Sequence, residues 1–276
     1  MMSDLRNSRA ANIHIPRVSI GMPVYNGEKF ICKALDSLLS QTFSDFELII
    51  SDNASTDNTE ALCLEYAACD SRIRYVRQEE NQGPLANFQY VLDEAVGEYF
   101  MWAACDDYWE PVCVEKWVYW LDEDVDAVLV FSNMRTFSHT SGKVMRLYVC
   151  PSIADSKRMR LLNRYLNCTP SLIYGLSRKS VCTDIPIETF DYFDVYWSCA
   201  MAVKGKILVD SDYLYNAGIK NDERVPYSLT NDRITYWRYF NKSIRLIRKN
   251  FNIFDQILLI GMAMLYTVKI IKDQRF

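Results

Sequence analysis

The first half of this 276-residue chain alternates between short apolar runs and amphipathic segments, and this alternation constrains the fold more than any other feature. Residues 18–23 are mostly apolar, and from Glu28 onward apolar residues recur at the i, i+3, i+4 spacing of a helix that buries one face. The pattern then repeats along the chain. It predicts strands at 18–23, 47–51, 73–76, 99–103 and 126–131, and helices from 28 and at 59–69, 85–96 and 111–121. Such βαβ units predict an α/β fold with a mostly parallel central sheet and helices on both faces.

The second half of the chain is less regular. The pattern predicts strands at 143–148 and 172–176, a helix at 157–166, and a helix at 195–203 that ends before Gly205. No linker rich in Gly, Pro or Ser and no internal repeat divides the chain, so a single domain is expected.

Polar clusters follow four of the predicted strands. They occupy 23–26, 52–57, 81–83 and 106–107. In open α/β sheets ligands bind outside the carboxyl ends of the strands, so we expect these clusters at one rim.

Two of the clusters carry carboxylates whose position suggests chemistry. Asp106 and Asp107 offer hard oxygen ligands for Mg²⁺ or Mn²⁺, which commonly binds one or two protein carboxylates together with substrate phosphates. Asp52 stands at a strand end, where a carboxylate can accept an N–H of a nucleotide base. Each of these residues alone is better explained as a turn or helix-capping residue.

Taken together, the four segments resemble family 2 glycosyltransferases of the GT-A fold over roughly residues 17–135. The matching segments read VSIGMPVYNG from Val18, ISDNASTD from Ile50, NQGPLAN from Asn81 and ACDDYWEP from Ala104. The resemblance implies an inverting enzyme that transfers a sugar from a nucleoside-diphosphate sugar with Mn²⁺ or Mg²⁺ as cofactor. It also implies a role in surface glycan or polysaccharide synthesis, with a glycan or lipid-linked glycan as acceptor.

The resemblance assigns roles by position. Asp106, five residues before Pro111, is expected to bind the metal, and Asp107 to support it or contact the sugar. The expected nucleotide-binding residues are Pro23, Val24, Tyr25, Asn26, Asp52, Asn53, Asn81 and Gly83. On this basis we divide the chain into a disordered leader (1–16), a GT-A domain (17–225) and a C-terminal helical segment (226–276). Within the domain, 17–135 is the expected nucleotide-binding half and 136–225 the acceptor-side half.

The chain departs from the family pattern at two points. Many relatives carry an Asp-x-Asp triplet whose first carboxylate contacts the sugar, and here that position is Ala104 or Cys105. The general base is expected just before a helix in the second half, where relatives often have Glu-Asp. Asp194 fits, eleven residues before Gly205, with Asp191 as the second choice and a helix cap as the alternative for either.

Aromatic residues next to the carboxylates suggest an acceptor contact. Tyr108 and Trp109 could stack against a sugar ring, although aromatic residues are more often part of the core. A catalytically impaired nucleotide-sugar-binding protein on the same fold remains an alternative. A nucleotidyltransferase is disfavoured, because the loop after the first strand lacks a Gly-rich, basic phosphate-binding sequence.

Composition and charge bear on the class of binding partner and on the cellular location. The net charge is −4 and no long basic block occurs, which argues against nucleic acid as a partner. The nine cysteines are odd in number and show no zinc-ligand spacing, so we expect reduced thiols in the core. The polar N-terminus lacks the apolar segment of a secretory signal, which favours a cytoplasmic location.

Residues 257–268 form an uncharged run followed by Lys269, Lys272 and Arg275. The run is shorter than the roughly twenty apolar residues that span a bilayer. It predicts either a helix packed on the domain or on a partner subunit, or an interfacial helix that contacts the inner face of the membrane.

Overall fold

The structure is a computed structural model that describes residues 14–150, 156–166, 170–187, 193–219 and 233–273. The strands are β1 (Val18–Val24), β2 (Phe46–Asp52), β3 (Ile73–Arg77), β4 (Tyr99–Trp102), β5 (Tyr108–Trp109), β6 (Ala127–Ser138), β7 (Val144–Tyr148), β8 (Leu176–Arg178) and β9 (Lys206–Ile219). The helices are α1 (Ile31–Leu39), α2 (Thr59–Cys69), α3 (Pro84–Asp93), α4 (Cys113–Glu123), α5 (Lys157–Leu166), α6 (Lys179–Cys182), α7 (Phe193–Lys204), α8 (Arg233–Asn250) and α9 (Ile253–Asp273), with a 3₁₀ helix η1 (Pro170–Tyr174). Most of the predicted leader, residues 1–13, lies outside the described residues.

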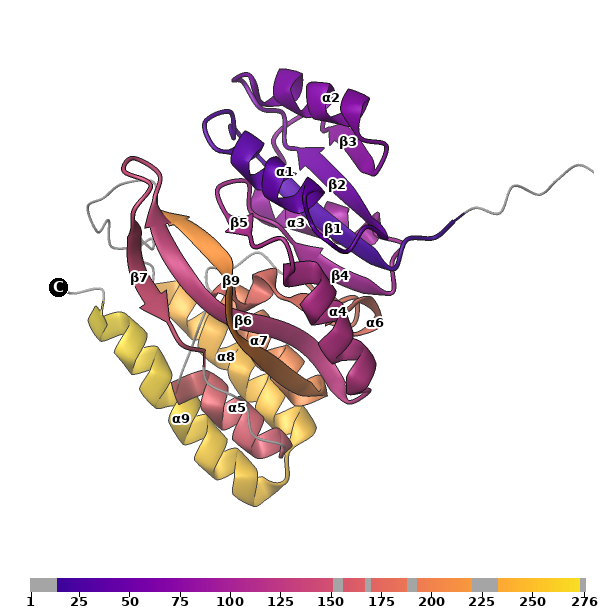
Figure 1. The fold of residues 1–276 in the computed structure, drawn as a ribbon. Helices are drawn as coiled ribbons and strands as arrows, with labels where there is room; N and C mark the ends of the chain where they lie inside the picture. The colour runs from indigo at the N-terminus through magenta and orange to yellow at the C-terminus, as the bar shows by residue number, and fades with distance from the viewer. Residues whose placement is uncertain (1–13, 151–155, 167–169, 188–192, 220–232, 274–276) are drawn as a thin grey trace, which may run out of the picture.

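One sheet runs through the molecule in the order β3-β2-β1-β4-β8-β6-β9-β5, and β7 pairs with the outer part of β6 (Figure 1). Strands β1 to β4 are parallel, which confirms the predicted mostly parallel sheet in the first half. Val24 lies opposite Asp52, and Asp52 lies opposite Arg77, so these strands end level with one another. The polar residues that follow them therefore meet at one rim.

The second half of the sheet is built around two long paired strands, β6 and β9, which the sequence pattern indicates only in part. The strand predicted at 126–131 extends to Ser138, and β9 pairs with it in parallel from end to end. The register shifts on both sides of Asn133, where the polar stretch of β9 around Asp210 and Asp212 lies. That stretch interrupts the apolar alternation, which is why β9 is not evident from the sequence.

The strand predicted at 172–176 is wrong. Residues Pro170–Tyr174 form a 3₁₀ helix, and the strand begins only at Leu176. The Gly175 N–H donates to the Leu172 carbonyl at 3.1 Å, which closes the turn, and a Cβ at Gly175 would overlap the Val130 carbonyl. A short apolar run has no periodicity that separates a buried strand from a buried turn.

The helices cover both faces of the sheet, and a second helical layer lies outside α7. Helix α3 packs on β1 and β2, whereas α7 packs on β6 and β9. Helices α5 and α8 pack on α7, and α9 lies across α5 and α8 at the edge of the molecule (Figure 1). A hydrophobic cluster joins these four helices through Leu161, Tyr165, Cys199, Val203, Ile247, Leu259 and Ala263.

The structure bears on the predicted state of the cysteines and on the predicted length of the apolar helices. Cys63, Cys113, Cys182 and Cys199 are buried free thiols, as expected of small apolar side chains, and Cys32 is half-buried. Within the described ranges, each helix is too short or too polar to cross a membrane.

Candidate active site

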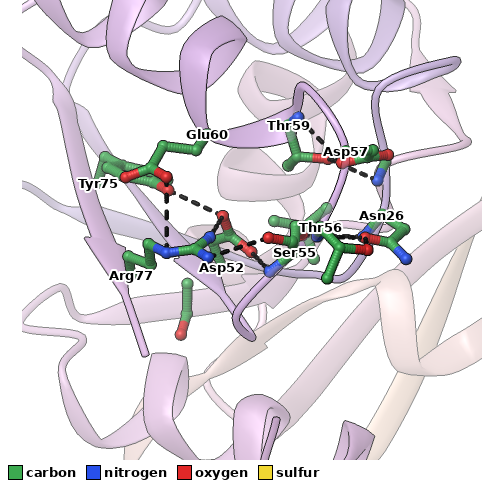
Figure 2. Close-up of polar contacts among 12 residues, drawn as sticks. Asn26, Asp52, Ser55, Thr56, Asp57, Thr59, Glu60, Tyr75 and Arg77 are labelled. Carbon is green, nitrogen blue, oxygen red and sulfur yellow. Dashed lines mark hydrogen bonds and ion pairs between the residues drawn. The ribbon is translucent and has the colours of Figure 1, made fainter. Parts of the chain in front are cut away.

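Asp52 is fully buried at the end of β2 and already has several partners (Figure 2). Its Oδ1 accepts the Ser55 N–H at 2.8 Å, and its Oδ2 accepts the Tyr75 hydroxyl at 2.8 Å. Arg77 donates to Oδ2 at 3.1 Å and also pairs with Glu60 at 3.5 Å. The carboxylate therefore anchors the loop after β2 to β3, and a base could reach it only if Arg77 moved.

The loops after β1 and β2 are fixed to each other. The Asn26 N–H donates to Ser55 Oγ at 2.9 Å, and Asn26 Oδ1 accepts the Thr56 N–H at 2.8 Å (Figure 2). Asn26 and Ala54 have φ values of 52° and 59°, a left-handed conformation that asparagine tolerates but alanine adopts only rarely. The hydrogen bonds between the two loops hold both of them in one arrangement and so form a preorganised surface.

The remaining residues of the first loop differ in accessibility. Pro23 is half-buried and the Val24 side chain is buried, so these two residues present mainly backbone to the rim. The Tyr25 side chain is 48% exposed, which leaves an aromatic face open at the rim.

Asn53 connects the rim to the loop before α3. Its Nδ2 donates to Asn81 Oδ1 at 3.0 Å and to the Gly83 carbonyl at 3.1 Å, and its Oδ1 accepts the Gln82 N–H at 3.0 Å. Gly83 has a φ of 85°, which suits glycine and lets the chain turn into α3. The structure thus brings Asn53, Asn81 and Gly83 together at the rim, as their positions after successive strands predict.

Asp107 holds the loop after β4 against β9. Its side chain is buried, Oδ1 accepts the Gly218 N–H at 2.8 Å, and Oδ2 accepts the Tyr215 hydroxyl. Burial raises the pKa of Tyr215 far above its usual range, and the Asp107 carboxylate raises it further, so the phenol keeps the proton that it donates. With both oxygens engaged, Asp107 is suited to supporting its neighbour.

Asp106 precedes this anchor and is half-buried. Its backbone carbonyl lies 2.8 Å from His139 Nε2, which donates when that nitrogen carries the proton. The His139 ring packs against both Phe30 and Phe137, with ring centroids 4.3 Å and 4.8 Å away. The imidazole therefore fixes the backbone of Asp106 from the side of β6.

A cleft of about 690 Å³ opens beside this contact. It lies between the start of α1, the loop after β2 and the turn after β6. Its lining residues are Asn26, Glu28, Lys29, Phe30, Asp57, His139 and Thr140. The cleft has acidic, basic and aromatic walls and borders the loop that carries Asp106.

The two aromatic residues predicted to contact an acceptor lie in different environments. Tyr108 is half-buried, and Lys33 Nζ lies 3.8 Å from its ring centre and 3.9 Å from that of Phe137. Burial lowers the pKa of Lys33. Trp109 is 1% exposed and packs against Tyr215, so its indole is inaccessible to an acceptor in this conformation.

Asp194 lies in the first turn of α7, and its Oδ1 accepts the Val195 N–H at 2.8 Å. Burial raises its pKa to about 6, although its hydrogen bond and the charge of Arg164 act in the opposite direction. One turn further, Trp197 packs edge-on against Trp102 at 5.4 Å, so this part of α7 lies beside the end of β4. The second candidate base, Asp191, lies outside the described residues.

The side chains present fit a cation that is completed by a substrate. Among the described residues no group of three or more His, Cys, Asp or Glu side chains forms a metal centre. Asp106 supplies a carboxylate at the strand exit, and Asp107 is already engaged. Mg²⁺ and Mn²⁺ commonly bind in this way, through one or two carboxylates and substrate phosphates.

Several residues of the site were not evident from the sequence. Tyr75 and Arg77 share one face of β3 through their i, i+2 spacing, and parallel pairing with β2 could have suggested them as partners of Asp52. His139, Tyr215 and Gly218 reach the Asp106 loop from distant parts of the chain, and no local motif marks them.

Known proteins with similar sequences and structures identify the family. Residues 19–179, more than half of the chain, match the model described as Glycosyl transferase family 2. The chain belongs to this family.

One relative matches most of this chain but a smaller share of its own length. Rv1520 of Mycobacterium tuberculosis (strain ATCC 25618 / H37Rv) is 32% identical over 218 residues, which cover 77% of this chain and 61% of that protein. The chain thus spans less than two thirds of that relative.

Two solved structures share the fold. S. aureus TarS 1-349 in complex with UDP-GlcNAc superposes with a TM-score of 0.75 at 20% identity, covering 91% of this chain and 72% of that one. The mannosyltransferase PcManGT from Pyrobaculum calidifontis, in complex with GDP-Man and Mn²⁺, gives a TM-score of 0.58 at 16% identity and covers 93% and 74%. Because both identities are below 25%, the similarity to these structures shows the GT-A-type fold alone.

Proposed function

We propose that this chain is an inverting, metal-dependent glycosyltransferase that transfers a sugar from a nucleoside-diphosphate sugar to an acceptor hydroxyl. The observation that carries the proposal is the rim at which the loops after β1, β2 and β4 meet. There Asn26 is locked to the loop that follows Asp52, and Asp106 leaves β4 on a loop fixed by Asp107 and His139. The two similar structures bind UDP-GlcNAc and GDP-Man, which supports a nucleotide-sugar donor.

Each candidate residue has a role in binding the donor, holding the metal or accepting a proton. The loop at Pro23–Asn26, with Asn53, Asn81 and Gly83, borders the nucleotide, and Asp52 contacts the base if Arg77 gives way. Asp106 would hold Mn²⁺ or Mg²⁺, which when bound neutralises the charge that develops on the departing diphosphate. Asp194 accepts the proton of the acceptor hydroxyl, whose oxygen attacks the anomeric carbon from the face opposite the leaving group.

The proposed acceptor, biosynthetic role and cellular location are based on the family resemblance. A glycan or lipid-linked glycan is the expected acceptor, in surface glycan or polysaccharide synthesis at the inner face of the membrane. Tyr108, with Lys33 over its ring, is the remaining candidate for stacking against the acceptor sugar.

Calorimetric titration with UDP, GDP and dTDP, each with and without Mn²⁺, tests the proposal. We expect one nucleotide to bind in a metal-dependent manner and Asp106→Asn to abolish that dependence. The matched control is Asp126→Asn, an exposed aspartate just before β6, at the opposite edge of the sheet from the rim. Absence of nucleotide binding under every condition would refute the proposal.

A panel of nucleotide sugars then separates the enzyme from the impaired binding protein. Hydrolysis or transfer from one donor supports catalysis, with loss of turnover in Asp194→Asn. Tight metal-dependent binding without any turnover would favour the binding protein, whose support is the missing first carboxylate of the Asp-x-Asp triplet at Ala104 or Cys105.

A further inference from the structure

Helix α9 is apolar on two opposite faces, but the protein covers only one of them. Leu259 and Ala263 are fully buried in the cluster shared with α5 and α8. The other face carries the outer stripe, which consists of the exposed residues Phe254, Ile257, Leu258, Met264 and Leu265. Phe254 is 82% exposed and Ile257 is 70% exposed. A helix that is apolar all round is expected to have both faces covered.

The outer stripe lies in basic surroundings. Helices α5, α8 and α9 together contain twelve Lys and Arg residues and two Asp residues, although the whole chain has a net charge of −4. Two of the twelve, Arg160 and Arg164, are buried, so only the other basic residues can contribute to the surface. Neither α5 nor α8 contains Asp or Glu, and Asp255 of α9 is paired with Arg158 of α5 at 3.0 Å. The charge of this part of the molecule therefore favours an anionic partner.

Exposed basic residues lie on the two helices against which α9 packs. Helix α9 packs against both α5 and α8 (Figure 1). Exposed cations of α8 are Arg245, Arg248 and Lys249. On α5, Lys157 is exposed, whereas the charge of Arg158 is already paired with Asp255. An apolar stripe flanked by cations matches the boundary between acyl chains and anionic headgroups.

We propose that α9 lies in the surface of a bilayer that contains anionic phospholipids. The outer stripe enters the acyl boundary, and the cations of α5 and α8 contact the headgroups. In this arrangement α9 lies along the bilayer surface, and only its outer stripe enters the bilayer. This surface lies on the far side of the molecule from β2 and β3, so it is separate from the rim at which the donor is proposed to bind (Figure 1).

Vesicle flotation of the full chain tests this proposal. We expect the chain to float with vesicles of phosphatidylcholine and phosphatidylglycerol in equal amounts, to bind pure phosphatidylcholine weakly, and to dissociate as salt is raised. The double variant Phe254→Ser with Ile257→Ser should bind at least about tenfold more weakly, because two apolar side chains no longer enter the bilayer. Arg245→Gln and Lys249→Gln should each weaken binding roughly fivefold.

The matched control is Val125→Ser, which removes an 81% exposed valine from the turn before β6 and should leave binding unchanged. All replaced side chains are exposed, so circular dichroism should show the same fold. Failure to float, or equal binding by the double variant, would overturn the proposal. So would a dimer in solution that the double substitution dissociates, because the outer stripe would then join two copies of the chain.

Discussion

At the scale of single residues, Asp194 combines a cost in stability with a suitable chemical property. Burial raises its pKa from an ordinary 3.8 to about 6, which means that the folded protein resists its ionisation. A carboxylate with a pKa near 6 is ionised at neutral pH and is a stronger base than an exposed aspartate. Both properties suit a general base.

If Asp194 is the base, kcat/KM should fall as the pH drops through about 6, and Asp194→Asn should be inactive at every pH. The folded-state pKa lies above the unfolded one, so its effect is absent below about pH 4, and a penalty develops between about pH 4 and pH 6 and is complete above that range. Asp194→Asn should therefore raise the unfolding free energy near pH 8 by up to about 3 kcal/mol, and should change it little near pH 4.

Urea denaturation of both proteins at the two pH values measures this difference. Asp126→Asn serves as the control at an exposed aspartate. An active Asp194→Asn enzyme would exclude the base role, and equal stabilities at both pH values would show that the burial of this carboxylate has no energetic consequence.

Asp52 shows why position at a strand end does not decide a role. Its oxygens accept hydrogen bonds from Ser55, Tyr75 and Arg77, so it stabilises the rim whether or not a nucleotide is present. Loss of donor binding in an Asp52 variant would therefore combine a lost contact with a disordered loop. A substitution at Asp106 therefore tests donor binding more directly than one at Asp52.

At the scale of elements, the end of β9 holds the loop that carries Asp106. Gly218 donates its N–H to Asp107, and a Cβ at this position would overlap both the Asp106 carbonyl and His139. We expect Gly218→Ala to displace the loop and weaken metal-dependent nucleotide binding at least about tenfold, with a loss of stability of about 1–3 kcal/mol.

Titration of the nucleotide with Mn²⁺ measures the effect on binding, and thermal unfolding measures the effect on stability. Gly261→Ala is the matched control, because nothing lies within 4 Å of a Cβ at that position on α9. The control should bind normally and be stabilised by about 1 kcal/mol, since alanine is the better helix former. Normal binding by Gly218→Ala would show that β9 does not position Asp106.

At the scale of the whole molecule, the C-terminal helices share their core with the rest of the chain. Ile247 and Leu259 pack with Leu161 of α5 and Val203 of α7 in one buried cluster. The boundary predicted at residue 226 separates segments whose side chains are buried against each other. We predict that the chain unfolds as one cooperative unit.

Ile247→Ala should lower the free energy of unfolding by about 3 kcal/mol, because a fully buried side chain is replaced by a cavity. Ile257→Ala on the exposed face of α9 should change it by less than about 0.5 kcal/mol. Denaturation followed by both tryptophan fluorescence and circular dichroism measures the two effects. Two separate transitions, with only the second shifted by Ile247→Ala, would instead identify the C-terminal helices as an independent unit.

Local sequence patterns were enough to predict the family, the parallel first half of the sheet and the order of the rim loops. These features depend on local periodicity and on short motifs such as ACDDYWEP from Ala104, which need no knowledge of distant contacts. The boundaries of α2 and α5 agree with their predicted ranges for the same reason.

The surroundings of the carboxylates, in contrast, depend on contacts between distant parts of the chain. Asp106 and Asp107 look alike in the sequence, but β9 engages the side chain of Asp107 and His139 reaches the backbone of Asp106. Tyr215 and Gly218 are more than a hundred residues away along the chain, and their approach depends on the pairing of β9 with β6 and β5. Local patterns cannot encode such contacts, because hydrogen bonding and burial depend on which distant segments the folded sheet places side by side.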